Sequence, residues 1–205
     1  MNLAPTTRLE AVNVLLASIV EAPVNSLDEN GLDEAAIASS VIDETSRAVQ
    51  THGWLWNTEY NYPLGRDNTS EIQVPSNTLK IHFKDSRYIT RGKRVYDRNT
   101  FSYRHSSDLT ADIIVGLDWE ELPEVLRAYI MYRAGRVFQA RQLGSQVLFA
   151  FTKEDENAAF LELSSTSMEM ENVSIFDNVE LQLMLNRDSS VSAFNYRAGS
   201  IGGSY

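Results

Sequence analysis

The hydrophobic residues of this chain change their spacing twice, and this order constrains the fold more than any other feature. Up to about residue 52 they recur at helical spacing, over 54–116 they alternate in short runs, and after about 119 helical spacing returns. A helix has a period of 3.6 residues and a strand a period of 2, so a β segment interrupts a helical chain. The sequence therefore predicts an α+β fold. We expect a helical bundle of about four helices with an inserted antiparallel β-meander and an extended C-terminal tail.

The same pattern predicts the domain boundaries. We expect a single domain over residues 1–186, because 205 residues suit one domain of ordinary size. Within it, helices over 7–52 and 119–165 flank the meander over 54–116. Residues 187–205 are rich in serine and glycine with scattered aromatic side chains. They are predicted to form a C-terminal arm that becomes ordered against a partner.

Local signals mark the ends of the helices. Thr7 and Glu10 have the spacing of a capping box, which predicts the start of the first helix. Gly53 has the position of a glycine that ends the second helix. A fourth helix is expected from about Ser145. Its inward face is predicted to consist of Val147, Phe151, Ala158 and Leu161.

The stretch THGWLWNTEYNYPL, which begins at Thr51, places aromatic residues at alternate positions. Alternation predicts a half-buried first strand, with its aromatic face packed against the bundle. That face would carry Trp54, Trp56, Tyr60 and Tyr62. His52 beside it is expected at a helix end, where a partial positive charge is favourable. We therefore interpret the stretch as part of the core and not as a binding pocket.

Sequence signals for catalysis or metal binding are weak. The three histidines, His52, His82 and His105, are not paired at helical spacing, and the chain has no cysteine. Phosphate-binding glycine loops and the nucleophile elbow are absent from the sequence. Acidic neighbours such as Glu120 with Glu121, or Asp155 with Glu156, are expected to serve helix starts or to face water. We predict no enzyme, no metal and no cofactor.

Charge is unevenly distributed. The net charge is −10, which argues against free binding to nucleic acid, because phosphate neutralisation needs a basic surface. The segment from Lys80 to Arg104, however, contains eight basic and two acidic residues. Its net charge is +6, so the remainder of the chain carries −16. This segment is either a surface for a partner or a set of charges that protects strand edges. Its candidate contacts are Arg91, Lys93, Arg94 and Arg98.

The C-terminal arm is a second candidate interface. Aromatic and arginine side chains commonly anchor protein interfaces. Those of the arm are Phe194, Tyr196, Arg197 and Tyr205. The alternative is a frayed terminus. At the other end, the first residues lack the pattern of a secretory signal, and the sequence has no apolar run of about 18 residues that would span a membrane.

Four stretches of the chain resemble one known family, in the same order along the sequence. They are AVNVLLASIVEAPVNSLD, VQTHGWLWNTE, DWEELPEVLRAYIMYRAGRVFQARQLG and VSIFDN. The family is the tail tubular protein A family, the portal adaptor or gatekeeper ring of short-tailed bacteriophages. The resemblance implies a structural virion protein and not a catalyst, and a bundle that carries a β-sheet.

The resemblance also implies partners. Family members form a twelve-fold ring between the portal protein and the tail nozzle, tail tubular protein B, with tail fibres attached nearby. DNA would pass through the ring channel without specific binding, and no membrane is involved. The implied location is the virion tail, after synthesis and assembly in the host cytoplasm.

Two other functions remain open at this point. A glycan-acting hydrolase would need two carboxylates at a fixed separation across a cleft. The sequence offers many acidic residues but no such constellation. A general protein-interaction module would be compatible with the basic segment and the arm.

Overall fold

The computed structural model describes residues 5–27, 33–144 and 146–175, and describes side chains in the last range for 153–170. The chain divides into two units, Met1–Ser164 and Ser165–Tyr205. The helices are α1 (Arg8–Ala17), α2 (Asp33–Gln50), α3 (Glu124–Gln142) and α4 (Gln146–Ile175), with short 3₁₀ turns η1 (Leu55–Asn57) and η2 (Trp119–Glu121). The strands are β1 (Thr58–Leu64), β2 (Thr78–His82), β3 (Tyr88–Arg91), β4 (Arg94–Asp97) and β5 (Leu109–Val115). This arrangement confirms the α+β class.

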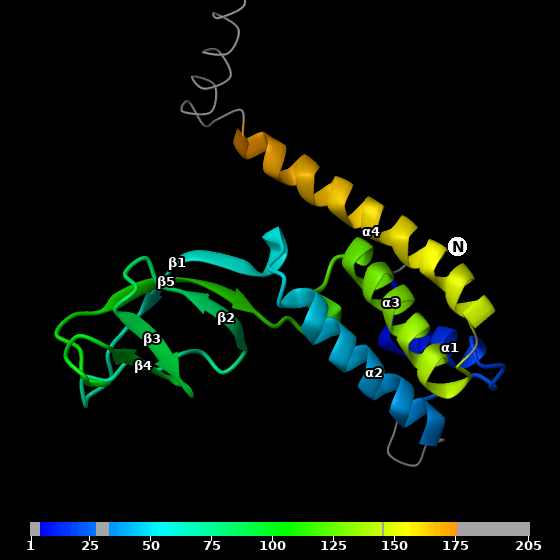
Figure 1. Ribbon diagram of the computed structural model, residues 1–205, viewed down its shortest axis with the longest axis horizontal. Coiled ribbons are helices and arrows are strands. Elements are labelled where there is room, and N and C mark those ends of the chain that lie inside the picture. The colour runs from blue at the N-terminus through cyan, green and yellow to red at the C-terminus, as the bar shows by residue number, and fades with distance from the viewer. Residues whose placement is uncertain (1–4, 28–32, 145, 176–205) are drawn as a thin grey trace, which may run out of the picture. The chain divides into compact units, whose positions relative to one another are not determined.

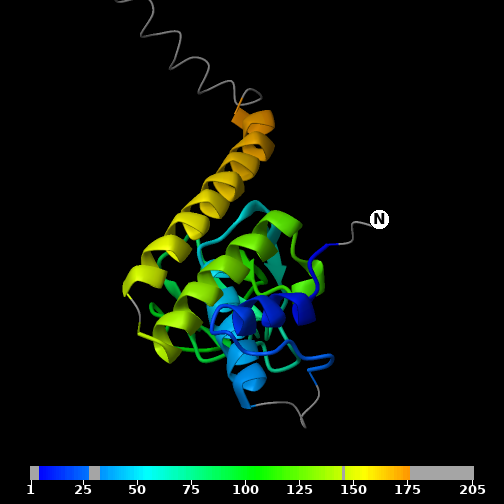
Figure 2. The same cartoon turned by 90° about the vertical axis from the view of Figure 1, so that its right-hand side faces the viewer.

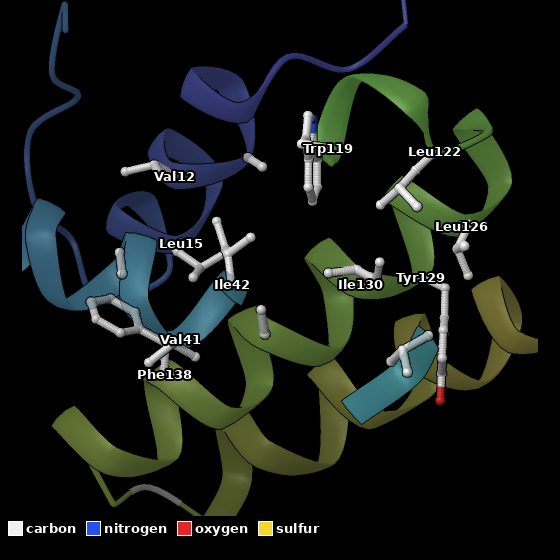
Figure 3. Close-up of a cluster of buried hydrophobic side chains, with 14 of the residues drawn as sticks. Val12, Leu15, Val41, Ile42, Trp119, Leu122, Leu126, Tyr129, Ile130 and Phe138 are labelled. Atoms are coloured by element: carbon white, nitrogen blue, oxygen red, sulfur yellow. The ribbon is translucent and has the colours of Figure 1, made fainter. Parts of the chain in front are cut away.

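Helices α1, α2 and α3 pack against one another (Figure 1), and Figure 2 shows α1 in dark blue beside the other two. Side chains from all three helices fill the space between them (Figure 3). Leu15, Ile42 and Phe138, one from each helix, have no exposed surface. Burying an apolar side chain of this size contributes about 1.5–3 kcal/mol. The helical core is therefore a conventional apolar one.

The predicted capping box is confirmed at the start of α1. The backbone N–H of Glu10 donates to the Thr7 hydroxyl at 3.2 Å, and the backbone N–H of Thr7 donates to the Glu10 carboxylate at 2.7 Å. Two donors that the first helical turn leaves unpaired are thereby satisfied. The bond from Thr7 holds the pKa of Glu10 below its ordinary value.

The predicted aromatic face of the first strand is wrong, although two of its four residues do pack against the bundle as expected. Trp54 and Trp56 precede β1 and belong to the helical core, Tyr62 packs on the sheet core, and Tyr60 is 69% exposed. The two tryptophans lie outside the strand because Leu55–Asn57 form the 3₁₀ turn η1. For the tyrosines the reason is a β-bulge. Glu59 pairs with Ile113 and Tyr62 with Ala111, so β1 has one residue more than β5 over that interval. The extra residue changes which face each later side chain occupies.

A short, closely packed connection joins α2 to the sheet. Gly53 has a φ of +86°, which other residues rarely adopt, and a Cβ there would lie 2.6 Å from Ile114 Cδ1, which would have to move. Asn57 is fully buried, and its amide donates to the carbonyls of Gln50 at 3.0 Å and Val115 at 2.8 Å. Its side-chain oxygen accepts from the backbone N–H of Trp54 at 2.8 Å. One side chain thus links the helix end, the 3₁₀ turn and β5.

The strands are antiparallel but do not follow one another in simple order. The larger sheet has the order β1-β5-β2, and β3 pairs with β4 as a separate hairpin. The segments EIQVP and FSYR, which have strand-like composition, contribute only isolated bridges. Both sides of β5 are therefore paired, which suits its apolar run at Ile113 and Ile114.

The predicted inward face of the fourth helix is wrong where it can be checked. Ala158 and Leu161 are exposed, whereas Ala159 and Leu163 are buried. The side chains of Val147 and Phe151 lie outside the described residues. The inward face instead includes Glu156, Ala159 and Leu163, and Glu156 pairs there with Arg136 of α3. An apolar pattern does not register a charged residue on the buried face.

Candidate functional site

The basic segment folds around the β3–β4 hairpin, whose turn is set by Gly92. Two residues, Gly92 and Lys93, connect the strands, and Arg91 pairs directly with Arg94. Gly92 has a φ of +63°, and Lys93 is not among the residues with positive φ. This combination is typical of a type II′ turn, which matches the twist of a two-residue hairpin. The turn therefore places two arginines opposite each other.

Like charges directly opposite on a sheet are unfavourable, and tyrosine rings relieve the conflict here. The Arg91 guanidinium lies 3.7 Å from the centre of the Tyr96 ring, and that of Arg94 lies 4.1 Å from the Tyr103 ring. The two rings meet edge-on at 5.0 Å. Arg94 also pairs with Glu71 at 3.1 Å. The guanidinium groups are thus held in fixed positions by cation–π contacts.

A nearly buried ion pair supports the base of the hairpin. Arg87 donates to Asp97 at 2.6 Å, and only 3% of the Asp97 side chain is exposed. The second carboxylate oxygen accepts from the backbone N–H groups of Asn99 at 2.9 Å and Thr100 at 3.4 Å. The Arg87 hydrogen bond, assisted by those backbone donors, holds the pKa of Asp97 far below its usual range.

The predicted interface residues of the basic segment lie on or directly after this hairpin. Arg91, Lys93, Arg94 and Arg98 are all exposed. Among the described residues, carboxylate partners for Arg91, Lys93 and Arg98 are absent, whereas Arg94 has Glu71. We call these four residues with Tyr96 and Tyr103 the hairpin surface. The arm residues Phe194, Tyr196, Arg197 and Tyr205 lie outside the described residues.

The sequence prediction missed the residues that organise the hairpin surface. Tyr96 and Tyr103 support two of its arginines, and Glu71 restrains one from another loop. Part of this signal is visible in the sequence. In RVYD, Arg94 and Tyr96 are two residues apart and share one face of a strand, so Tyr96 lies diagonally opposite Arg91, the cross-strand partner of Arg94. Glu71 could not be found in this way, because its approach depends on tertiary structure.

The acidic pairs do not assemble a catalytic constellation. Glu121 accepts from the backbone N–H of Asp118 at 3.1 Å at the start of η2, as the sequence predicts for a helix start. The expectation that Glu156 faces water is wrong, because it is buried and bonded to Arg136. Over the residues the structure describes, there is no group of three acidic or histidine side chains that could hold a metal.

The histidines are also separate. His105 is buried with Nε2 3.1 Å from the carbonyl oxygen of Val95, whereas His52 and His82 are exposed. Within the described part of the chain, the helices are too short or too polar to span a membrane.

A charged surface that is exposed on a folded chain can steer association with other proteins. The model of the family described as tail tubular protein matches residues 9–173. The chain belongs to the tail tubular protein family, so it is a structural component of a bacteriophage tail. No curated protein matches the chain.

Proposed function

We propose that this chain is a ring-forming head-to-tail adaptor, which joins the portal to the tail nozzle and lines the channel of genome ejection. The observation that carries the proposal is the hairpin surface, a basic face on a chain whose net charge is −10. A closed ring needs two different, complementary patches on each subunit, because its interface is head-to-tail. The hairpin surface and the acidic remainder would provide such a pair.

The acidic balance also suits the wall of a channel. A surface that neutralised many phosphates would hold DNA and delay its passage. Electrostatic repulsion keeps DNA away from a wall of the same sign. In this proposal twelve copies form the ring, and DNA passes without specific binding. No enzymatic activity is involved.

The domain and the C-terminal arm would have different roles in assembly. Residues 1–186 form the adaptor domain, and residues 187–205 form an arm that docks on a neighbouring subunit or the portal. The nozzle protein, tail tubular protein B, binds the opposite face, and tail fibres attach near the joint. Assembly takes place in the host cytoplasm, and the ring remains in the virion tail.

The direct test is the mass of the particle formed with the portal of the same virus. Mass photometry of the mixture should detect portal rings that carry twelve copies of this chain. A chain that remains monomeric beside a correctly assembled portal contradicts the proposal. The chain alone is not informative, because adaptor rings can depend on the portal as a template.

Charge reversal at the hairpin surface tests its part in docking. Lys93→Glu with Arg98→Glu changes exposed side chains, so stability should change by no more than about 0.5 kcal/mol. Binding to the portal-templated ring should weaken and lose its salt dependence. A matched control reverses Arg47 and Lys153, which are exposed on α2 and α4. Equal binding by the two double variants would mean that the hairpin surface is not part of the interface.

A further inference from the structure

The bundle contains a hollow with an aromatic wall, bounded by the end of α2, by α3 and by α4. Its volume is about 620 Å³, within the roughly 300–1,000 Å³ of pockets that take ligands. The ring side chains that line it are His52, Trp54, Tyr129 and Phe160, all in the first unit. The Tyr129 and Phe160 rings lie 5.4 Å apart, and the His52 and Trp54 rings lie 5.0 Å apart. Phe160 is 44% exposed, so part of this aromatic wall is open to a partner.

One charged side chain of the hollow keeps hydrogen-bond donors available. Arg133 lines the hollow and donates at 2.9 Å to the hydroxyl of Tyr129, which is neutral. Among the residues that the structure describes, Arg133 has no carboxylate partner. Glu156 also lines the hollow, but both of its carboxylate oxygens accept from Arg136. A guanidinium carries five N–H groups, so Arg133 can still bind an anionic group.

The ring wall and Arg133 together define the chemistry of a ligand. An aromatic ring can pack face or edge against the wall. A carboxylate can accept two parallel hydrogen bonds from one guanidinium. Nucleic acid is disfavoured as the source of the anion, because a chain with a net charge of −10 repels a polyanion. The hollow therefore suits a ligand that combines an aromatic ring with a carboxylate.

The polar part of the wall favours a peptide as the carrier of these groups. Asn157 lines the hollow and is exposed. Its amide can both donate and accept, which matches the N–H and C=O groups of a peptide backbone. The chain belongs to a family of tail proteins, and aromatic side chains commonly anchor contacts between proteins. We propose that the hollow binds a segment of another tail protein in which an aromatic residue stands beside an aspartate or a glutamate.

Titration of the full-length chain with three blocked dipeptides tests this site. N-acetyl-Phe-Glu-amide carries the ring and the carboxylate, N-acetyl-Phe-Gln-amide lacks the charge, and N-acetyl-Ala-Glu-amide lacks the ring. Saturation-transfer NMR at concentrations up to the millimolar range measures the Kd of each. The Phe-Glu peptide should bind about tenfold more tightly than the Phe-Gln peptide, because it adds a hydrogen bond between charged groups. The Ala-Glu peptide should also bind more weakly, because it cannot pack on the rings.

Two substitutions assign the two contacts to their residues. Arg133→Gln should abolish the advantage of the Phe-Glu peptide and leave binding of the Phe-Gln peptide unchanged. Phe160→Ala should weaken both aromatic peptides alike, and the fold should tolerate it because Phe160 is partly exposed. Arg47→Gln is the matched control, since Arg47 is exposed on α2 and does not line the hollow.

Several outcomes would overturn the proposal. Equal binding of the Phe-Glu and Phe-Gln peptides by the wild type would do so, as would an advantage that survives Arg133→Gln. Phenylacetate that binds as tightly as the Phe-Glu peptide would make the hollow a site for small aromatic acids. Dimers of the free chain that sediment as such and disappear with Phe160→Ala would assign the hollow to a second copy. These measurements use the free chain, so they are independent of whether a ring forms on the portal.

Discussion

The helical bundle and the β region are held together by different means. Among the residues that the structure describes, the helical core contains nineteen buried apolar side chains, whereas the sheet core contains six. The β region supplements its small core with the Arg87–Asp97 ion pair and with arginines stacked on tyrosines. Apolar packing depends little on pH or on charge screening by salt, whereas ion pairs are sensitive to both. We therefore expect core substitutions to dominate stability in the bundle, and charge to matter more in the β region.

The largest effect is expected from Phe138→Ala, which removes a fully buried ring from α3. Such a truncation costs about 3–5 kcal/mol, because a cavity is left in addition to the lost transfer energy. The free energy of unfolding from denaturant titration measures it. Tyr132→Ala on the same helix is the control, since Tyr132 is 40% exposed. Equal effects of the two substitutions would mean that the bundle core does not dominate stability.

A smaller effect is expected from Asn57→Ala at the junction of the two regions. The substitution removes the donor from the carbonyls of Gln50 and Val115 and the acceptor from the backbone N–H of Trp54. Each of these three hydrogen bonds contributes about 0.5–1.5 kcal/mol net, so a loss of about 1.5–4.5 kcal/mol is expected. The junction would weaken, and calorimetry should resolve separate transitions for the bundle and the β region.

Asn77→Ala is the control for the junction, because the Asn77 amide makes a longer, exposed hydrogen bond of 3.4 Å to Gly116. It should change stability by less than about 1 kcal/mol. A single, unchanged transition in the Asn57 variant would mean that the two regions are coupled mainly by packing around Trp54.

The sequence predicts the bundle better than the β region, for reasons that can be traced to particular residues. Thr7 and Glu10 act on each other locally, so their capping box is fully encoded within four positions. The apolar face of α3 is also local, and Leu126, Ile130 and Phe138 are buried as their spacing predicts. Local periodicity predicts the buried face of α3, but it predicts the wrong face for α4, where the charged Glu156 is among the buried residues.

The β region depends on contacts between distant residues. The bulge between Glu59 and Tyr62 exists only relative to β5, about fifty residues away. Asn57 is fully buried although asparagine is usually exposed, because it serves three backbone groups. The hairpin surface was predicted by charge, but its stacking on Tyr96 and Tyr103 was not. Sequence composition predicts where charge gathers, and tertiary contacts determine how it is presented.

The smallest of these effects, and the one specific to the β region, is expected from Asp97→Asn. The folded pKa of Asp97 is lowered, so its ionised form stabilises the fold above the unfolded pKa of about 3.9. That contribution is lost as the pH falls from about 4 through the folded pKa. The wild type should therefore melt several degrees above the variant, by a constant margin from about pH 5 to 8, and the margin should shrink below about pH 4.

Asp155→Asn, at an exposed position on α4, should show neither the margin nor its pH dependence. A margin for Asp97→Asn that persists unchanged in acid would show that shape, and not charge, accounts for its effect. The β region would then be held together in the same way as the bundle.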